Sequence, residues 1–208
     1  MPPCERFAHG RWYGVAMSET QVQGRGAAAD PKDVVRPLLH TRQVREFTDE
    51  PLAEEVVDTI ADVARWSGSS SNEQPWRFIV IRENATLRKI AEAGQPQTKP
   101  LNTASAAVAI VVPDEKERAV SRGYDEGRAA ERMLVAATML GIAGGVAWIL
   151  PTNRDRVREI LGVPGDHFVR TVVALGHPTD AAQRPKSAPG QARLPREQVV
   201  FEEHWQER

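Results

Sequence analysis

The chain has 208 residues, enough for one domain with a well-buried core. Lys and Arg total 27 against 28 Asp and Glu, so the net charge of -1 offers no attraction to nucleic acid or to an anionic membrane. Cys4 is the only cysteine, which excludes an intrachain disulfide and a cysteine cluster that could hold a metal.

The sequence carries neither a membrane span nor a secretory signal. No run of about 20 consecutive apolar residues is present, and residues 1–14 lack the long apolar core of a signal peptide. We therefore expect a cytoplasmic protein that binds no membrane and no nucleic acid. The histidines are scattered without a pair at metal-ligand spacing, so no metal site is predicted (His9, His40, His167, His177 and His204).

The first third of the chain changes from irregular to helical. Residues 1–32 are rich in Gly, Pro, Arg and Ala without periodicity, which predicts a disordered N-terminal tail. Residues 34–39 predict a short helix. Apolar side chains at helical spacing predict a longer helix over residues 54–67.

The middle of the chain alternates strands and helices. Apolar runs at residues 78–81 and 106–112 predict two strands, separated by a helix at 86–93. Residues 126–140 predict the longest helix, which has almost no polar face. A helix that is apolar nearly all round belongs in a core or between subunits.

The last third of the chain again alternates strands with helices, and the pattern then ends. Residues 146–150 predict a strand, residues 154–161 a helix that ends at Gly162, and residues 169–175 the last strand. The central domain is therefore expected over residues 33–178. Residues 179–208 have little core of their own and are interpreted as a C-terminal extension that wraps a partner subunit.

The first segment with chemical interest is residues 41–51. Arg42 and Arg45 lie one turn apart if this stretch continues the first helix, so both could face one anion. The planar guanidinium donates paired hydrogen bonds that suit a phosphate group. The alternative is a pair of solvated surface arginines, which this segment alone does not exclude.

Two further segments could complete a binding site. Residues 66–76 contain small hydroxyl side chains with Asn72 and Gln74, whose amides can match the mixed donor and acceptor edge of a flavin. Residues 140–149 contain three glycines, which would let the main chain approach a flat ring. A simple linker and close helix–strand packing are the respective alternatives.

Taken in chain order, these segments resemble the nitroreductase family, which binds FMN. The likeness runs from about Val34 to Trp205. Its most specific parts are the Arg-rich opening followed by Phe-Thr-Asp-Glu-Pro and, further on, Ser-Ser-x-Asn-x-Gln-Pro-Trp. The resemblance implies an α+β fold, with a mixed β-sheet flanked by helices, in an intertwined homodimer with FMN sites at the interface.

The resemblance also implies which side chains hold the phosphate end of FMN. Arg42, Gln43 and Arg45 match the opening motif, which binds the phosphate and the ribityl or pyrimidine oxygens. Arg193 matches the Arg of a closing Arg-Leu-Pro motif that binds phosphate. Thr41 stands where many members have another Arg, so one charge partner of the phosphate is missing.

The ring end of FMN is expected to meet residues from other parts of the chain. The loop that reaches the flavin, usually from the other subunit, corresponds to Ser69, Ser70 and Asn72. Main chain beside the reactive N5 edge corresponds to Ile149 and Leu150, and Lys99 corresponds to a lysine near the flavin O2. No side-chain nucleophile or acid is expected, because the flavin carries the reaction.

The implied activity is a ping-pong, two-electron reduction. NADH or NADPH would deliver hydride to the flavin, and a nitroaromatic, quinone-like or other small organic acceptor would then receive it. Other chemistry known in the family stays open, namely dehalogenation, flavin fragmentation and reduction linked to the deazaflavin F420. A flavin-binding protein without catalysis is the alternative of a different class.

Overall fold

The structure is a computed structural model that describes residues 30–184, 186–188 and 191–205. The chain divides into two units, residues 1–36 and residues 37–208. Within the described part of the first unit, Asp30 caps helix α1 (Pro31–Val34) by accepting a hydrogen bond from the Lys32 amide at 2.8 Å. The tail predicted over residues 1–32 lies outside the described residues except for its last three.

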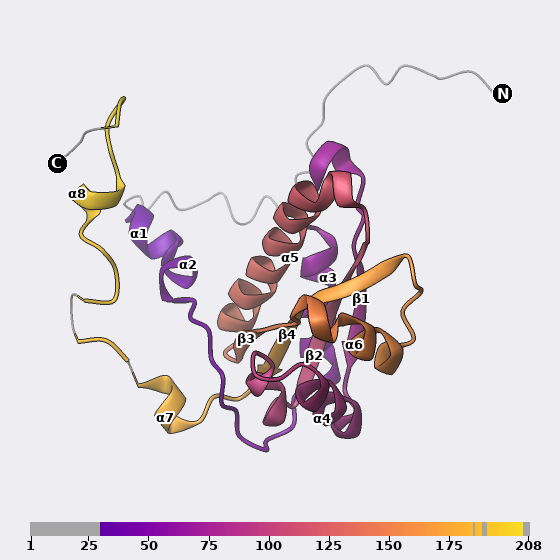
Figure 1. Ribbon diagram of the computed structural model, residues 1–208. Coiled ribbons are helices and arrows are strands. Elements are labelled where there is room, and N and C mark those ends of the chain that lie inside the picture. The colour runs from indigo at the N-terminus through magenta and orange to yellow at the C-terminus, as the bar shows by residue number, and fades with distance from the viewer. Residues whose placement is uncertain (1–29, 185, 189–190, 206–208) are drawn as a thin grey trace, which may run out of the picture. The chain divides into compact units, whose positions relative to one another are not determined.

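Four strands form a single sheet in the second unit (Figure 1). They are β1 (Arg77–Ile81), β2 (Ala106–Pro113), β3 (Ala143–Trp148) and β4 (His167–Gly176), in the spatial order β1-β2-β4-β3. All three strand pairs are antiparallel. Among the described residues, the parallel pairing expected of a mixed sheet is found only in one isolated bridge, between Gln43 and Gly144, at the β3 edge.

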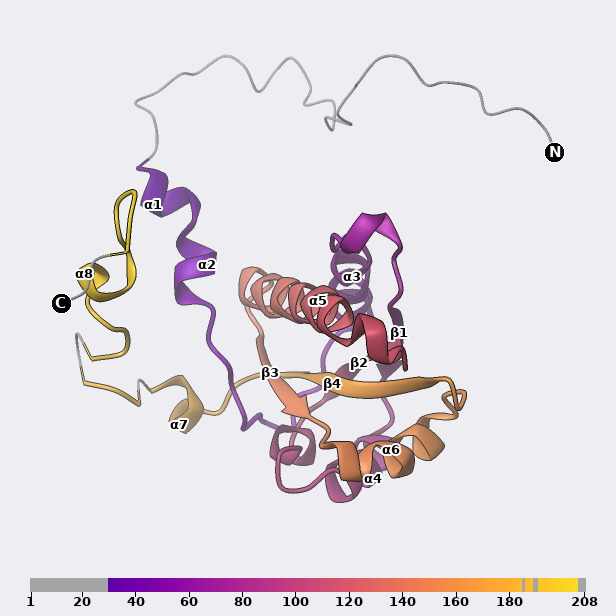
Figure 2. The same cartoon turned by 45° about the horizontal axis from the view of Figure 1, so that its top comes forward.

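Two layers of helices cover the two faces of the sheet (Figures 1 and 2). One face packs against α3 (Glu54–Arg65) and α5 (Ala119–Met139), the other against α4 (Asn84–Ala93) and α6 (Arg154–Leu161). Alternate residues of β2 belong to the two cores, as strand geometry requires. Ala107, Ala109 and Val111 join the α4/α6 core, whereas Ala106, Val108, Ile110 and Val112 join the α3/α5 core. The predicted α+β fold is confirmed.

Short helical elements connect these parts and occupy the C-terminal extension. The chain has α2 (Arg36–His40), η2 (Ser70–Asn72), η3 (Lys99–Asn102), η4 (Lys116–Arg118), η5 (Pro151–Asn153), α7 (Asp180–Gln183) and α8 (Arg196–Val199). The short helix predicted over residues 34–39 is instead divided between α1 and α2.

Helix α5 is longer and more polar than the sequence pattern predicted. It begins at Ala119 rather than at residue 126. The apolar pattern did not predict these first turns because the residues that they bury include Arg122, Asp125 and Glu126 instead of apolar side chains. The expectation of a helix almost without a polar face is wrong: charged side chains lie on its exposed face as well. The buried charges are accommodated by ion pairs and hydrogen bonds, as burial of charge requires.

Strand β3 also begins earlier than predicted, at Ala143, and ends at Trp148. Its glycines serve close packing on both sides. A Cβ at Gly144 would lie 2.7 Å from Cδ2 of Leu134 on α5, and one at Gly145 would lie 1.9 Å from the main-chain oxygen of Val44. Because β3 ends at Trp148, Ile149 follows the strand and does not lie within it.

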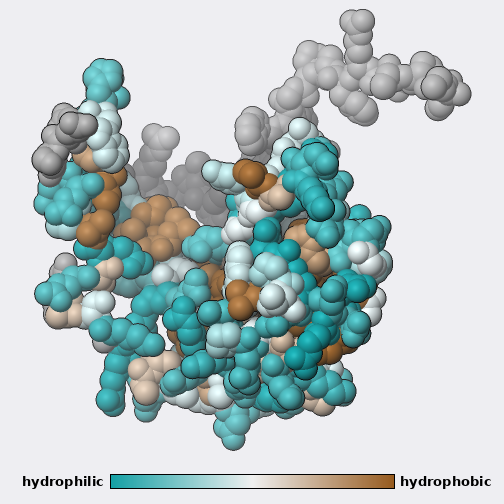
Figure 3. Space-filling view, in the orientation of Figure 1, coloured by the Kyte–Doolittle hydropathy of each residue, from teal (hydrophilic) through white to brown (hydrophobic). Residues whose placement is uncertain are grey.

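The face of the molecule seen in Figure 3 is mainly hydrophilic, with apolar patches between the polar side chains. Several large apolar side chains are exposed in the second unit: Leu38, Leu39, Trp66, Val120, Tyr124, Met139, Leu140, Trp148, Leu194, Val199, Val200 and Trp205. Among the described residues, no helix has both the length and the apolar character needed to cross a bilayer.

Candidate functional site

Residues 41–48 run as extended chain between β3 and the segment that follows β4. The Val44 amide donates to the Gly144 carbonyl at 2.8 Å, and the Thr48 amide donates to the His177 carbonyl at 2.8 Å. Buried Phe47 packs against Gly176, where a Cβ would lie 2.8 Å from that of Phe47. These contacts fix the main chain that carries the predicted phosphate-binding side chains.

The expectation that Arg42 and Arg45 share one helical face is wrong. Helix α2 ends at His40, and the following segment is extended because it bridges to Gly144 on the edge of β3. Side chains three residues apart on an extended chain point to opposite sides. Both arginines are exposed, but Arg42 lines a pocket and Arg45 is not among that pocket's lining residues.

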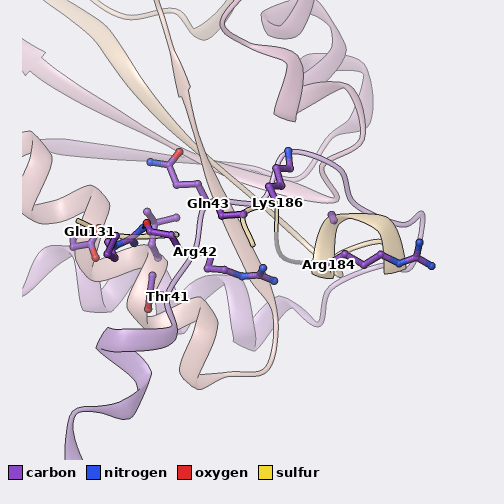
Figure 4. Close-up of a pocket in the computed structure, with 11 residues that line it drawn as sticks. Thr41, Arg42, Gln43, Glu131, Arg184 and Lys186 are labelled. Atoms are coloured by element: carbon purple, nitrogen blue, oxygen red, sulfur yellow. The ribbon is translucent and has the colours of Figure 1, made fainter. Parts of the chain in front are cut away.

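The pocket beside Arg42 is a cavity of about 440 Å³ rich in positive charge (Figure 4). It is formed by the segment after α2, by α5 and by the segment after β4. Its lining residues are Thr41, Arg42, Gln43, Glu131, Leu134, Ala182, Arg184, Lys186, Ser187, Ala192 and Arg193. Four cationic side chains and a single carboxylate line it, so the pocket suits an anion.

Individual contacts show how the cationic side chains are arranged. Arg42 Nη2 donates to the Gln183 carbonyl at 2.8 Å, which ties the extended segment to the end of α7. Arg193 Nη1 donates to the carbonyl of its neighbour Ala192 at 2.8 Å. Arg184 extends away from Thr41 and Glu131 (Figure 4). Each guanidinium keeps further N–H groups for a ligand.

The pocket brings together three of the predicted site residues: Arg42, Gln43 and Arg193. It adds Arg184 and Lys186, which sequence reasoning missed. The sequence signal that could have found these two residues is the recurrence of basic residues in the extension after β4.

The predicted flavin loop lies elsewhere, between α3 and β1. Ser69 Oγ accepts a hydrogen bond from the Gln74 amide at 2.8 Å, and the Ser70 amide donates to Oδ1 of Asp125 at 2.9 Å. Asn72 has a positive φ of 54° and its side chain is exposed. The loop is thus anchored to α5 while its outer side chains stay accessible.

Ion pairs strengthen the attachment of this loop to α5. Glu73 pairs with Arg118 and, at 2.9 Å, with Arg122. Hydrogen bonds from Arg118 and then Arg122 hold the pKa of the Glu73 carboxyl below its ordinary value. Burial alone would lower the pKa of Arg122, but hydrogen bonds to Glu115 and Glu73 outweigh burial and raise it.

The third group of predicted residues lies where β3 ends. The Ile149 side chain is fully buried, and its amide donates to the Arg170 carbonyl at 2.7 Å. The Trp148 amide donates to the Gln97 carbonyl at 3.4 Å, which places the loop that carries exposed Lys99 beside this point. The Ile149 side chain is therefore not accessible to a ligand here, whereas Leu150 is partly buried and Trp148 and Lys99 are exposed.

A single chain does not bring these three groups together. Among the described residues, no hydrogen bond or ion pair joins the loop 69–74 to the cationic pocket. The loop is held at Asp125 of α5, whereas the pocket meets α5 at Glu131 and Leu134. The six to nine residues of helix between these positions correspond to about 9–13 Å along its axis.

Comparison with known proteins identifies the class that this fold and these motifs define. A family model described as "Nitroreductase family" matches residues 38–177. A protein of Archaeoglobus fulgidus, provisionally named NADH dehydrogenase/NAD(P)H nitroreductase, is 32% identical over 158 residues, which cover 72% of this chain and 87% of that protein. The chain belongs to the nitroreductase family, which confirms the resemblance drawn from the sequence.

Two further comparisons give the same family or fold. The FMN reductase [NAD(P)H] of Bacillus subtilis is 27% identical over 190 residues, 82% of this chain and 74% of that protein. The solved structure of the NADPH:FMN oxidoreductase of Vibrio harveyi superposes with a TM-score of 0.70 at 24% identity, covering 84% of this chain and 79% of that one. The latter likeness supports the fold.

Proposed function

We propose that this protein is an FMN-dependent NAD(P)H oxidoreductase that transfers two electrons to a small organic acceptor. The observation that carries the proposal is the cationic pocket that Arg42, Gln43 and Arg193 line together, since the resemblance assigns these three residues to the phosphate end of FMN. The names of two family relatives, an FMN reductase [NAD(P)H] and an NADPH-flavin oxidoreductase, support the cofactor and the electron donor.

The residues of the pocket fit the phosphate group of FMN. A phosphate monoester carries a charge of about -1.5 to -2 at neutral pH, which Arg42, Lys186 and Arg193 can balance even with Glu131 nearby. This surplus of cations offsets the threonine at position 41, where many family members have an arginine. The Gln43 side chain is fixed through its Oε1, which accepts from the Val146 amide at 3.3 Å, so its NH₂ group can donate to the cofactor.

The remaining predicted residues would hold the ring system. When bound, FMN supplies the hydride chemistry that joins a reduced nicotinamide to the acceptor. Asn72 offers an exposed amide on an anchored loop, and Lys99 offers positive charge beside the end of β3. The Ile149 amide already donates a hydrogen bond to the Arg170 carbonyl. The main chain at this point would therefore shape the wall of the site rather than donate a hydrogen bond to the flavin.

We further propose that the site is completed in a homodimer. The loop 69–74 and the cationic pocket are separated in one chain, so a second copy could supply the loop to the pocket. The exposed apolar side chains Val120, Tyr124 and Met139 on α5 give that copy a surface to bury. The C-terminal extension, residues 179–208, would wrap the partner.

The first experiment is an absorption spectrum of the purified protein, with the released chromophore identified by mass. Bands near about 370 and 450 nm and release of FMN are expected from bound oxidised flavin. Oxidation of NADH or NADPH with an added quinone or nitroaromatic then separates a reductase from a flavin-binding protein without catalysis. A colourless protein that also takes up no added FMN would overturn the proposal.

A further inference from the structure

The loop 69–74 has a main-chain conformation that its own sequence does not favour. Ser71, Asn72 and Gln74 all have positive φ angles, of 50°, 54° and 53°, and none is glycine. Such a conformation is strained for a residue other than glycine and persists only where the surroundings impose it. The groups that hold this loop therefore decide where its exposed side chains lie.

The strongest buried contact to the loop comes from Asp125 on α5. Its Oδ1 accepts from the Ser70 amide at 2.9 Å, and the residue is only 2% exposed. Hydrogen bonds to a charged acceptor inside a protein are stronger than neutral ones. The pairs of Glu73 with Arg118 and Arg122 add to the attachment, but Glu73 is exposed and its contribution is screened by solvent.

Asp125 is not explained by stability alone. Its second oxygen, Oδ2, is buried and has no hydrogen-bond partner among the described residues. A buried carboxylate with an unsatisfied oxygen costs stability, and an apolar side chain in its place would remove that cost. The benefit of a carboxylate at this position must therefore come from Oδ1, which fixes the start of the 3-10 turn that carries Asn72.

We propose that Asp125 is a positioning residue: by holding the Ser70 amide, it sets the conformation of the loop 69–74 that presents Asn72 to the flavin. This inference rests on the proposed FMN function. Asp125 itself need not touch the cofactor, since it lies beneath the loop and is almost fully buried.

The test compares Asp125→Ala, Asp125→Asn and Glu126→Gln. The asparagine variant keeps the Oδ1 acceptor. Glu126 is the matched control, because it is the neighbouring carboxylate and equally buried, but it pairs with Arg170 and not with the loop. Each variant is measured as purified full-length chain by hydrogen exchange of residues 69–74 without cofactor and by titration with FMN.

Asp125→Ala should accelerate exchange in the loop and raise the Kd for FMN by about tenfold, the loss expected for one hydrogen bond to a charged group. Asp125→Asn should restore both to within about threefold of the wild type, since its carbonyl oxygen still accepts. Glu126→Gln should lower the melting temperature without changing either loop measurement. A purely structural role would give Asp125→Ala and Glu126→Gln the same profile, which would overturn the inference.

A second pair of variants tests the same bond from the loop side, in case Asp125→Ala does not fold. Ser70→Pro removes the amide N–H at the first position of the turn, where proline fits, whereas Ser70→Ala keeps it. Proline should loosen the loop and weaken FMN binding at least about tenfold relative to alanine. Equal behaviour of the two variants would overturn the role of the bond. Wild-type chain that binds no FMN would instead overturn the proposed function, and with it the positioning of a cofactor.

Discussion

The main-chain oxygen of Val44 lies so close to Gly145 that a Cβ on that glycine would be 1.9 Å away from it. The Val44 amide also donates to the neighbouring Gly144 carbonyl at 2.8 Å. The main chain of the segment that carries Arg42 therefore lies directly against the main chain of β3, and only glycine at position 145 allows that approach.

Gly145→Ala should displace this segment and open the cationic pocket. The added methyl group meets main chain, which cannot move aside as a flexible side chain would, so we expect a clear fall in melting temperature and loss of FMN binding. Gly165→Ala is the control, because its new Cβ would meet only Arg158 Nη1 at 3.7 Å. Wild-type stability in Gly145→Ala would contradict the packing described for β3.

Arg42→Ala and Arg193→Ala should each weaken FMN binding by about 1.5–3 kcal/mol, the usual loss for a hydrogen bond to a charged group. Isothermal titration of the apoprotein measures the change. Arg65→Ala removes an exposed arginine from α3, away from the pocket, and should leave the affinity unchanged. If Arg42→Ala and Arg193→Ala both bind FMN as the wild type does, the phosphate site lies elsewhere.

Mixing two variants with weakened FMN binding tests whether the site is shared between subunits. In a heterodimer of Arg42→Ala with Asn72→Ala, one site would carry both substitutions and the other neither. Unfolding and refolding the two chains together should therefore recover wild-type FMN affinity in a fraction of the sites, whereas each variant refolded alone should keep its weakened affinity. A site contained within one chain predicts no recovery on mixing.

The ion pairs of Glu73 predict a dependence of stability on pH. The folded-state pKa of Glu73 lies below the ordinary value of 4.5, chiefly because Arg118 and then Arg122 donate hydrogen bonds to its carboxylate. The ion pairs of Glu73 therefore contribute fully to the free energy of unfolding above pH 4.5. This contribution to stability is lost as the pH falls through the lowered pKa of Glu73.

Melting temperatures between about pH 6 and pH 3 check this prediction, because the interval spans the ordinary pKa of a glutamate. The wild type should lose stability more steeply than Glu73→Gln at the acidic end. Glu83→Gln, a change in an exposed carboxylate outside this network, is the control. Parallel curves for wild type and Glu73→Gln would show that the pairs add nothing to the fold.

Periodicity predicted most of the helices and strands because their core-facing residues repeat regularly. It failed at α5, where Arg122 and Glu126 are buried through pairing with residues outside the helix, among them Glu73 and Arg170, which are distant in sequence. It also failed after α2, because the extended form of residues 41–48 depends on the edge of β3. Contacts of this kind are not encoded in local spacing.

The candidate site was predicted in part for a similar reason. Arg42, Gln43 and Arg193 were identified through motifs and do meet in one pocket. Lys186 was not, since it lies in the extension without a motif of its own. The anchoring of the loop by Asp125 was also outside the reach of the sequence, because nothing in its spacing marks a carboxylate that bonds a main-chain amide 55 residues away.

The distance along α5 between the anchored loop and the cationic pocket has a thermodynamic consequence. If each flavin is held by parts of two chains, the ligand binds only the associated form, so cofactor affinity and subunit affinity are linked. Dilution of the protein would then release FMN, and excess FMN would hold the subunits together. The concentration of the enzyme itself would set the fraction that carries cofactor.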